Sequence, residues 1–542
     1  MSNPWFELKS KIAKEIRTDI SKIEEPTQKG FGDFAYQCFE AAKGLKEKPN
    51  ETAERIAKAV KLKGVKAKAI GPYVNFYIDW NVFGQKLLEG IDINYGRGEK
   101  KKKALIEHTS INPNASPHVG RARNAIIGDS IVRILKFLGY DTEVHYWVND
   151  MGKQIALLVW GCRLRKFRFS DLLKIYVWAN KKMEKDPKVE REVFNLLSDF
   201  EKGDKKVRKR FKEVVDICVK GQKEILKDLN VHYDYFDYGS EVFGKTGKIL
   251  EKLEATGKLV TDEHGRKVLP YKDTFFVLAR GDGTSLYGLR DIAYTLDKLK
   301  KAKDMNIIVL GEDQKLYFEQ LSHALGLLGY KPPRVVHYSF VLLPTGKMST
   351  RKGEVVLLED FLFEAYGKAL EEVKRRYPEL RPKEMNKRAK AIAAAAVRYT
   401  IVKVSPDKNV VFKLDDALRF EGDTGPYLQY THARAGSILK KAKKVPKKFD
   451  ARLLEDKREM EVMKKLSQFP GILEKSVAEL KPHLLAVYLH ELADLFNEFY
   501  QNVNVLRAET KLRNARLQLV KTTKTVLKNG LGLLGIEAPE KM

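Results

Sequence analysis

The most constraining feature of the sequence is an alternation of short apolar runs with amphipathic segments between residues 104 and 343. The apolar runs are ALIEHT (104–109), TEVHYWV (142–148), TFFVLA (274–279), NIIVLG (306–311) and VVHYSFVLL (335–343). Buried strands that alternate with helices predict a parallel, doubly wound sheet. In such a sheet, ligands bind outside the carboxyl ends of the strands.

The segments that flank this alternation have other patterns. Residues 1–90 mix helical patterns with short β-like pieces and predict a small α/β domain, which ends near the charged run GRGEKKKK. Residues 401–542 follow a helical apolar period almost throughout and predict an all-α domain. A charged stretch at about 165–230 predicts a helical insertion within the domain of residues 91–400. The chain is therefore predicted to be a multidomain α/β protein.

The charge balance points to a polyanionic partner. Lysine and arginine number 101 against 72 acidic residues, which gives a formal net charge of +29. An excess of this size favours a nucleic acid as the partner. The alternative is a lysine-rich surface with ion-pair networks of the thermophilic kind, since 32% of the residues are charged.

The cysteines and the apolar runs restrict the compartment. Cys38, Cys162 and Cys218 lie far apart, so they form no CxxC pair and no zinc-ligand spacing. A reducing, cytoplasmic compartment fits this usage. The sequence has no uninterrupted apolar run of membrane-spanning length, and its first residues lack the apolar core of a signal peptide. We expect no membrane association.

The stretch PHVGRARNAIIGD (117–129) concentrates nitrogen donors at a predicted helix start. A helix N-terminus offers free N–H groups and a partial positive charge, and Gly120 lets a ligand approach the backbone. His118 and Arg121 add side-chain donors, so the pattern favours a phosphate site. The alternative is a solvated surface face.

A second stretch, PTGKMSTRKGEV (344–355), follows a predicted strand and combines cations with hydroxyls. Its lysine, arginine and hydroxyl side chains can close over a triphosphate and stabilise charge on leaving pyrophosphate. By itself it would be a basic surface loop. The residues that carry this interpretation are Lys347, Ser349, Thr350, Arg351 and Lys352.

Together the two stretches resemble the HIGH and KMSKS signatures of class I aminoacyl-tRNA synthetases, in the expected order. The longer blocks resemble arginyl-tRNA synthetases of the archaeal style. These blocks are IEHTSINPNASPHVGRARNAIIGDS, VNDMGKQIA, LYGLRDIAYT, LGEDQ, KMSTRKG, FEGDTGPYLQYTHARA and LLGIEAPEKM. The resemblance implies a Rossmann-type catalytic domain and an anticodon-binding helical domain. It implies ligation of arginine to the 3′-terminal ribose 2′-hydroxyl of tRNA(Arg) through an arginyl-adenylate, with tRNA required for activation.

The resemblance also assigns an arginine pocket. A planar guanidinium is best held by carboxylates. Asp291 is the predicted guanidinium partner, and Tyr287 lies four residues before it on the same helical face. The remaining predicted pocket residues are Glu107, Asn112, Gln314 and, on a looser motif, Glu241. Asn149, Asp150 and Gln154 form a further polar cluster, interpreted as pocket or hinge residues.

ATP binding is assigned to both signature stretches. The predicted contacts are His118, Gly120, Arg121, Gly311, Asp313, Lys347 and Met348, and the catalytic set adds Ser349, Arg351 and Lys352. Arg121 stands where the family has a second histidine. Thr350 replaces the second lysine, so either Arg351 or Lys352 must supply that charge. Asp313 could instead be a helix N-cap. Mg²⁺ is expected to arrive with ATP, and no protein metal site is expected.

The flanking domains are expected to bind tRNA, and the enzyme is expected to be a monomer. The predicted tRNA contacts are Phe31, Tyr36, Tyr427, Tyr430, Asn497, Tyr500 and Arg513, with Phe499, Asn502 and Arg516 as further candidates. The alternative for the aromatic residues is core packing, above all for Phe34 beside Phe31.

Other functions fit the sequence less well. A cysteine-specific synthetase would need zinc ligands, and an aliphatic-type synthetase would need a β-rich editing insertion. A catalytically silent tRNA-binding paralogue, or a purely structural RNA-binding module, would not need the pocket and signature residues together. A nucleotidyltransferase with the HxGH motif would not need the helical C-terminal domain.

Overall fold

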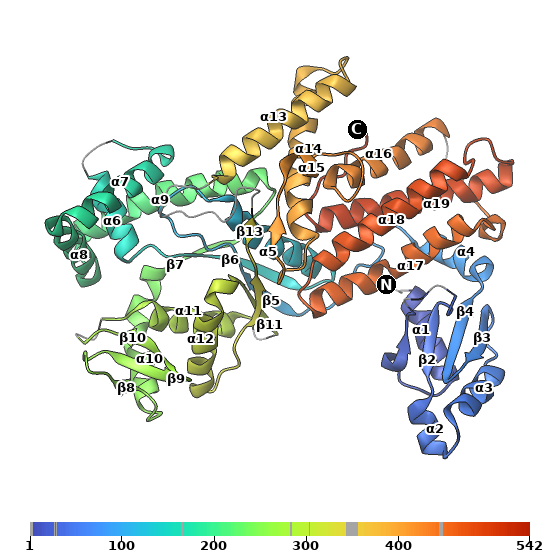
Figure 1. Ribbon diagram of the computed structural model, residues 1–542, viewed down its shortest axis with the longest axis horizontal. Coiled ribbons are helices and arrows are strands. Elements are labelled where there is room, and N and C mark those ends of the chain that lie inside the picture. The colour runs from blue at the N-terminus through green and yellow to red at the C-terminus, as the bar shows by residue number, and fades with distance from the viewer. Residues whose placement is uncertain are drawn as a thin grey trace.

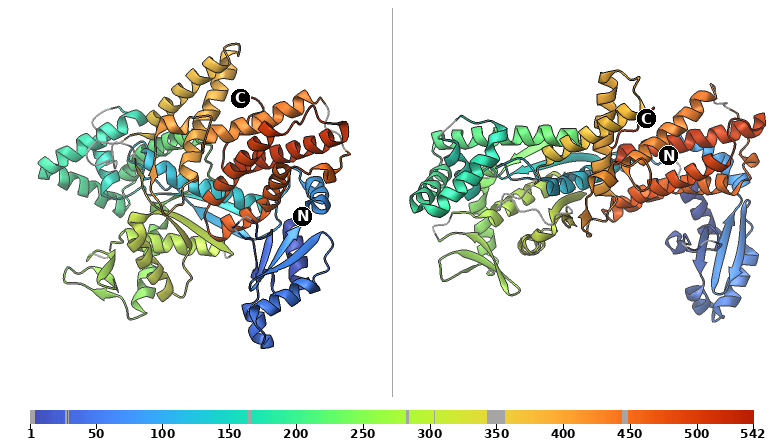
Figure 2. Two further views of the ribbon diagram at one scale, coloured as in Figure 1. Left: turned by 45° about the vertical axis from the view of Figure 1, so that its right-hand side comes forward. Right: turned by 45° about the horizontal axis from the view of Figure 1, so that its top comes forward.

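The computed structural model describes residues 4–26, 28, 30–163, 166–281, 284–302, 304–342, 356–443 and 448–542 of the chain. A central sheet lies between a helical insertion on one side and a group of long C-terminal helices on the other (Figure 1). The N-terminal domain lies beside the C-terminal helices and projects away from the rest, as two further views show (Figure 2).

The central sheet has five parallel strands. They are β5 (Lys103–Glu107), β6 (Asp141–Val148), β7 (Tyr235–Tyr238), β11 (Met305–Gly311) and β12 (Arg334–Tyr338), in the order β12-β11-β5-β6-β7. The strands are apolar because both faces are covered, and Leu105 and Ile106 of β5 are fully buried. The chain leaves β5 toward β6 on one side, while β11 pairs with β5 on the other. The predicted doubly wound sheet is confirmed, with its switch point between β5 and β11.

Helices cover this sheet and extend it. They are α5 (Val119–Phe137), α6 (Lys153–Cys162), α7 (Leu172–Lys185), α8 (Pro187–Lys202), α9 (Lys205–Asp228), α10 (Thr246–Glu254), α11 (Tyr287–Lys301) and α12 (Lys315–Leu327). The stretch predicted as a charged helical insertion forms α7 to α9. Asp186 caps α8 by accepting from the backbone of Lys188, and Asp204 caps α9 by accepting from the backbone of Lys206.

Two predicted strands differ from expectation. TFFVLA forms β10 (Thr274–Ala279) in an antiparallel sheet with β9 (Lys267–Tyr271) and β8 (Val260–Thr261), so its place in the parallel sheet was wrong. The physical reason is the two-residue turn between β9 and β10, where Lys272 has φ 50°, because a turn this short can join only antiparallel strands. VVHYSFVLL divides into β12 and β13 (Val341–Leu342), and β13 pairs with β14 (Val410–Val411). Strand β7 was not predicted.

The N-terminal domain is an antiparallel sheet with helices. It contains β1 (Ile23–Glu24), β2 (Phe34–Gln37), β3 (Val65–Ile70) and β4 (Tyr73–Ile78) in the order β1-β2-β4-β3, and α1 (Pro4–Glu15), α2 (Phe39–Leu45), α3 (Pro49–Ala59) and α4 (Trp80–Gly90). Trp5, Phe34 and Phe76 are buried in its core. Asp33 forms an ion pair with Lys464 of the C-terminal region, at 2.8 Å.

The C-terminal region is almost entirely helical, as predicted. Its helices are α13 (Leu358–Arg376), α14 (Pro382–Val402), α15 (Leu414–Ala417), α16 (Gly425–Lys441), α17 (Lys457–Ala478), α18 (His483–Asn502) and α19 (Thr510–Leu533). The expected boundary at residue 400 falls inside α14, which contacts α5 of the central region as well as α16.

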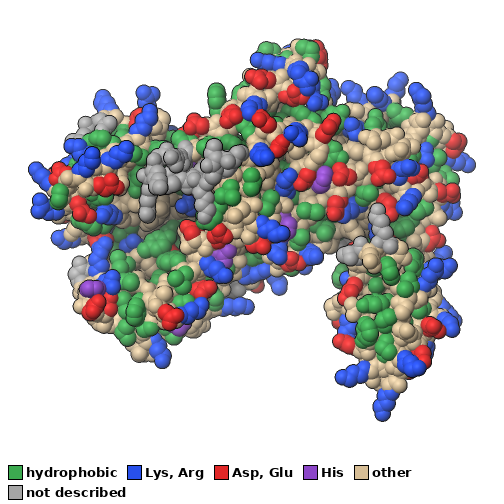
Figure 3. Space-filling model, viewed as in Figure 1, with side chains coloured by type: hydrophobic (Ala, Val, Ile, Leu, Met, Phe, Trp, Pro, Cys, Tyr) green, Lys and Arg blue, Asp and Glu red, His purple; other side chains and the backbone are tan. Residues whose placement is uncertain are grey.

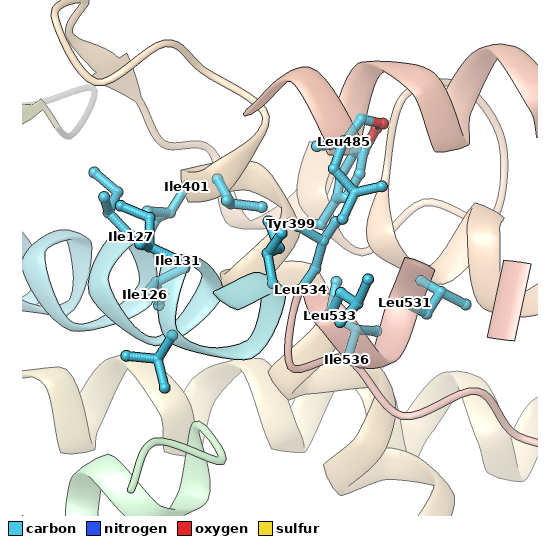
Figure 4. Close-up of a cluster of buried hydrophobic side chains, with 14 of the residues drawn as sticks. Ile126, Ile127, Ile131, Tyr399, Ile401, Leu485, Leu531, Leu533, Leu534 and Ile536 are labelled. Carbon is cyan, nitrogen blue, oxygen red and sulfur yellow. The ribbon is translucent and has the colours of Figure 1, made fainter. Parts of the chain in front are cut away.

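A shared apolar core joins these helices to the sheet. Figure 4 shows Ile127 and Ile131 of α5 together with Ile401 of α14 and Leu531 of α19. At the same junction the fully buried Arg398 pairs with Asp129 of α5 at 2.5 Å and donates to the Leu534 carbonyl at 2.7 Å. This pair joins α5 to the C-terminal region. Because separation of the two partners would leave a buried charge uncompensated, the pair holds α5 against that region.

Candidate active site

Two adjoining cavities lie at the carboxyl ends of β5 and β11. The α11 cavity, of about 280 Å³, is lined by Glu107, Thr109, Ser110, Asn112, Arg121, Asn124, Trp147, Asn149, Tyr287, Asp291, Tyr294, Thr295, Lys298, Ile308, Val309, Leu310, Gly311, Gln314, Tyr317 and Leu321. The α5 cavity, of about 200 Å³, is lined by His118, Gly120, Arg121, Gly311, Asp313, Tyr338, Phe340 and Val341. Arg121 and Gly311 line both, so two ligands could meet there.

The turn after β5 has an unusual backbone. Thr109 has φ 75° and Ser110 has φ 42°, a left-handed conformation that costs a β-branched residue in particular. Asn124 of α5 holds the turn, because its Oδ1 accepts from the backbone N–H of Thr109 at 2.5 Å. The Nδ2 of Asn124 donates to the Val309 carbonyl of β11 at 2.8 Å. One side chain therefore fixes α5 relative to both strands at the switch point.

His118 occupies the N-cap position of α5 and faces the α5 cavity. Burial and the neighbouring Arg121 lower the pKa of the His118 imidazole to about 4, so the ring is neutral near pH 7. Its Nδ1 has no hydrogen-bond partner among the described residues. The backbone N–H of Val119 is already bound to the Val356 carbonyl at 3.1 Å, so this donor is not free for a ligand.

The second signature stretch lies outside the described residues, and with it Lys347, Met348, Ser349, Thr350, Arg351 and Lys352. The chain on its two sides lies at the site. Val341 lines the α5 cavity before the stretch. After it, the N–H of Leu358 donates to the Pro117 carbonyl at 2.8 Å.

The α11 cavity contains two acids, Glu107 and Asp291. Among the described residues, no basic side chain is bound to Asp291. Its Oδ2 accepts from the Tyr317 hydroxyl at 2.7 Å. Removal from water raises the pKa of Asp291 to about 7, and the neighbouring Glu107 acts in the same direction. Tyr287, 40% exposed, is one turn earlier on α11, and its ring lies 5.3 Å from that of Tyr317.

Glu107 at the end of β5 is paired inside the protein. Its Oε2 forms a buried ion pair with Lys298, and its Oε1 accepts from the Ser110 hydroxyl at 3.2 Å. Lys298 also lies 4.3 Å from the centre of the Tyr294 ring. Sequence reasoning missed Lys298, Tyr294 and Tyr317. For Tyr294 and Lys298 the sequence held a signal, because they lie three and seven residues after Asp291 and so on the same face of the predicted helix.

The remaining predicted pocket residues divide between two sites. Asn112 and Gln314 line the α11 cavity, and the Asn112 amide donates to Gln154 Oε1 at 3.2 Å. Glu241 lines a separate cavity of about 260 Å³ beside α9, together with Asp150. Asp150 accepts from the backbone N–H of Ser240 at 2.9 Å. The structure thus brings together the predicted arginine residues except Glu241.

The predicted tRNA contacts differ in exposure. In the N-terminal domain Phe31 is 38% exposed, whereas Tyr36 and Phe34 are buried and pack in the core. Figure 3 shows Lys and Arg side chains spread over the visible face rather than gathered at one point.

In the C-terminal region, Phe499 and Asn497 are buried. The Asn497 amide donates to the Tyr427 hydroxyl at 2.9 Å. Tyr430 and Tyr500 flank a cation, because the guanidinium of Arg434 lies 4.8 Å and 5.1 Å from their ring centres. Sequence reasoning missed Arg434. Arg513 and Arg516 lie on α19, and Arg516 is paired with Glu459.

The three cysteines are buried and form no disulfide. In the described ranges, His, Cys, Asp and Glu side chains form no group of three or more that could hold a metal ion. Every described helix is too short or too polar to cross a membrane.

Known families match the chain in three successive segments. The family described as "Arginyl tRNA synthetase N terminal domain" matches residues 7–78, "tRNA synthetases class I (R), catalytic domain" matches residues 85–414, and "DALR anticodon binding domain" matches residues 428–542.

Individual relatives match over almost their whole length. The arginine–tRNA ligase of Methanocaldococcus jannaschii is 42% identical, over 100% of this chain and 99% of its own. That of Methanococcus aeolicus is 40% identical, over 98% and 97%. The solved arginyl-tRNA synthetase of Thermus thermophilus superposes with a TM-score of 0.85 at 28% identity and covers 99% of both chains. The chain therefore belongs to the arginyl-tRNA synthetase family, within class I of the aminoacyl-tRNA synthetases.

Proposed function

We propose that the protein ligates arginine to the 3′-terminal ribose 2′-hydroxyl of tRNA(Arg), through an arginyl-adenylate made from ATP. The observation that carries the proposal is the pair of cavities that share Arg121 and Gly311. The α11 cavity offers an acid to a cationic side chain, and the α5 cavity offers neutral and cationic donors to phosphate. A common border lets an amino-acid carboxylate meet the α-phosphate.

Arginine would lie in the α11 cavity with its guanidinium at Asp291. A carboxylate in this enclosed position is a strong acceptor for a planar donor fork. Tyr287 would line the side chain, and Glu107, Asn112 and Gln314 would hold its ammonium and carboxylate end. Glu241 is left out of this pocket because it lines another cavity.

ATP would lie in the α5 cavity. His118, Gly120 and Arg121 would contact its phosphates, and Gly311 and Asp313 its ribose. Asp313 is the one carboxylate among the described residues that line this cavity. A single carboxylate fits Mg²⁺ that arrives bound to ATP rather than in an all-protein cage. Lys347, Met348 and Ser349, with Arg351 or Lys352, would close over the triphosphate.

The reaction needs positioning and charge stabilisation rather than a protein nucleophile. An arginine carboxylate oxygen attacks the α-phosphorus in line, and the bond from that phosphorus to the bridging oxygen of pyrophosphate breaks. The ribose 2′-hydroxyl oxygen then bonds to the arginyl carbonyl carbon, and the bond from that carbon to the phosphate oxygen breaks. AMP leaves, and the hydroxyl proton passes to solvent. Arg121 lines both cavities and would stabilise charge in the first step.

The tRNA would contact Phe31 in the N-terminal domain and a cluster formed by Tyr430, Arg434 and Tyr500 in the C-terminal region. Phe31 and Tyr500 are exposed, whereas Tyr430 and Arg434 are half-buried. Tyr427 and Arg513, which are also half-buried, are further candidate contacts. Aromatic rings beside a guanidinium suit unstacked bases. Tyr36 and Asn497 would act through packing, because both are buried.

ATP–pyrophosphate exchange tests the proposal. Exchange with arginine in the presence of tRNA(Arg), and none with the other amino acids, is expected. Exchange with a different amino acid and none with arginine would contradict the proposal. Arginine-dependent exchange without tRNA would overturn only the expected tRNA requirement.

A further inference from the structure

A buried arginine lies behind the α5 cavity. Arg123 follows Arg121 by two residues on α5 and is fully buried, although a guanidinium is costly to remove from water without partners. Burial lowers the pKa of this guanidinium to about 10, so the group keeps its charge near pH 7. Its hydrogen bonds to described residues go to main-chain carbonyls rather than to a carboxylate. A side chain bound in this way fixes the position of the backbone.

The carbonyls belong to two segments that are far apart in the chain. The Nη1 of Arg123 donates to the Ser339 carbonyl at 2.7 Å and to the Phe340 carbonyl at 3.2 Å. Its Nη2 donates to the Ser405 carbonyl at 2.9 Å. Ser339 and Phe340 join β12 to β13, whereas Ser405 follows α14. Because the guanidinium is a rigid, planar fork, it holds the two segments at a fixed separation.

The first of these segments leads into the wall of the α5 cavity. Phe340 and Val341, together the wall segment, line this cavity. Strand β13 begins at Val341 and lies beside α5 (Figure 1). In the described chain β13 pairs with β14, and each strand has two residues. A two-stranded ladder this short is marginal by itself, so the wall segment needs further support.

The second segment, residues 405–409, supplies part of that support. None of its residues is among the described residues that line the α5 cavity. A change in this segment can therefore disturb the wall segment without removing an atom from the cavity. The bonds between the two are those from the Ser339 N–H to the Pro406 carbonyl at 2.8 Å and from the Phe340 N–H to Asn409 Oδ1 at 3.0 Å.

We propose that Arg123 is a positioning residue of the ATP site, which ties the Ser339–Phe340 peptide to residues 405–409 and so sets the wall segment of the α5 cavity. This inference rests on the proposed function, because that function places ATP in this cavity. Loss of the tie should weaken ATP binding. Arginine binding should persist, since none of the tied residues is among the described residues that line the α11 cavity.

Substitution of Arg123 tests the tie through the Michaelis constants of the two substrates. Arg123→Met keeps an unbranched side chain but removes the donors. We expect KM for ATP in arginine-dependent exchange to rise about 20-fold, while KM for arginine stays within about threefold of the wild-type value. Arg123→Lys keeps the charge but has a single nitrogen, so it cannot hold both segments as a fork. Its KM for ATP should show an intermediate rise of about fivefold.

Asn409 offers a second test at the surface of the protein. Asn409→Ala removes the acceptor of the Phe340 N–H, and because Asn409 is exposed, the variant should fold. KM for ATP should rise about fivefold. Asn409→Asp keeps an acceptor oxygen, so its KM for ATP should stay within about twofold of the wild-type value.

Two controls separate the tie from general effects. Lys408→Ala changes the exposed neighbour of Asn409 and should alter neither Michaelis constant. Arg133→Met removes another arginine of α5, whose Nη2 donates to the Asn230 carbonyl at 2.6 Å. Arg133 is not among the described residues that line either cavity. Its loss should lower the thermal unfolding temperature and leave KM for ATP unchanged.

Calorimetric titration with ATP and Mg²⁺ completes the test, because it does not depend on the activation of arginine. The Kd for ATP should rise about fivefold in Asn409→Ala and stay near the wild-type value in Asn409→Asp. Should Arg123→Met not fold, this pair of variants decides the question.

The inference fails if Asn409→Ala binds ATP like the wild type, or if Arg123→Met raises both Michaelis constants equally. It also fails if Arg123→Lys has the wild-type KM for ATP, because charge alone would then account for the role of Arg123. Failure of the proposed function would appear separately, as a wild-type protein that binds ATP but does not activate arginine.

Discussion

The two cavities at the switch point are built in different ways. In the α11 cavity, side chains are bound to one another, as in the contacts of Tyr317 with Asp291 and of Lys298 with Glu107. In the α5 cavity, the Nδ1 of His118 has no hydrogen-bond partner among the residues that the structure describes. Selection of an amino acid needs a preorganised set of groups, whereas a triphosphate can be gripped by donors that its own binding satisfies.

The comparison predicts its largest effect at Asp291. Asp291→Asn keeps the shape and an acceptor for Tyr317 but removes the negative charge that faces the guanidinium. We expect kcat/KM for arginine to fall about 1000-fold, while KM for ATP changes less than about threefold. Arginine-dependent exchange in the presence of tRNA measures both.

Asp297→Asn is the matched control, because Asp297 lies on the same helix but pairs with Lys245 at 2.5 Å. Its kinetics should remain close to those of the wild type. An equal loss of arginine and ATP binding in Asp291→Asn would contradict the assignment of separate cavities.

A somewhat smaller effect is expected in the α5 cavity. His118→Ala removes a donor that acts on the phosphates as charge develops, so kcat should fall about 100-fold. KM for arginine should stay within about threefold of the wild-type value. The exposed His232 provides the control, as His232→Ala. A rise in arginine KM that matches the loss in kcat would contradict the assignment of His118 to the phosphates in the α5 cavity.

The two cavities should also respond differently to pH. Because the pKa of Asp291 is raised to about 7, this acid is mostly neutral at pH 6 and mostly ionised at pH 8. KM for arginine should therefore fall about tenfold from pH 6 to pH 8. The pKa of His118 is lowered to about 4, so His118 stays neutral and KM for ATP should be flat. An arginine KM that is independent of pH would argue against Asp291.

The smallest effect is expected at Asp313, an exposed residue at the edge of the α5 cavity. Asp313→Asn retains one acceptor for a ribose hydroxyl but loses the charge. KM for ATP should rise about fivefold, with arginine kinetics unchanged. Asp313 does not cap the following helix, because the N-cap position of α12 is Gln314, so that alternative is wrong. An unchanged KM for ATP would contradict the assignment of Asp313 to the ribose.

The sequence predicted the parts of the site that depend on local order. The parallel sheet, the helix that starts after His118 and the pair Tyr287 and Asp291 follow from periodicity, from spacing and from the family resemblance. The strand TFFVLA was misplaced because an apolar run is compatible with either sheet. Glu241 follows β7, which is parallel to β6, yet its side chain lines the neighbouring cavity.

Long-range pairing could not be read in the same way. Lys298 and Glu107 are 191 residues apart, and the order of strands that brings them together is set by the whole fold. Tyr317, on α12, reaches Asp291 across the interface between two helices. The spacing of seven residues puts Lys298 on the same helical face as Asp291, but a lysine on an amphipathic helix is ordinarily exposed, so the spacing by itself does not predict its burial.

The most direct test is a crystal structure with a non-hydrolysable analogue of arginyl-adenylate. We expect a guanidinium at Asp291, an adenosine beside Gly311 and Asp313, and the phosphate mimic near His118 and Arg121. Lys298 should remain paired with Glu107. A guanidinium at Glu107, or an adenosine outside the α5 cavity, would contradict the assignment of arginine and ATP to these two cavities.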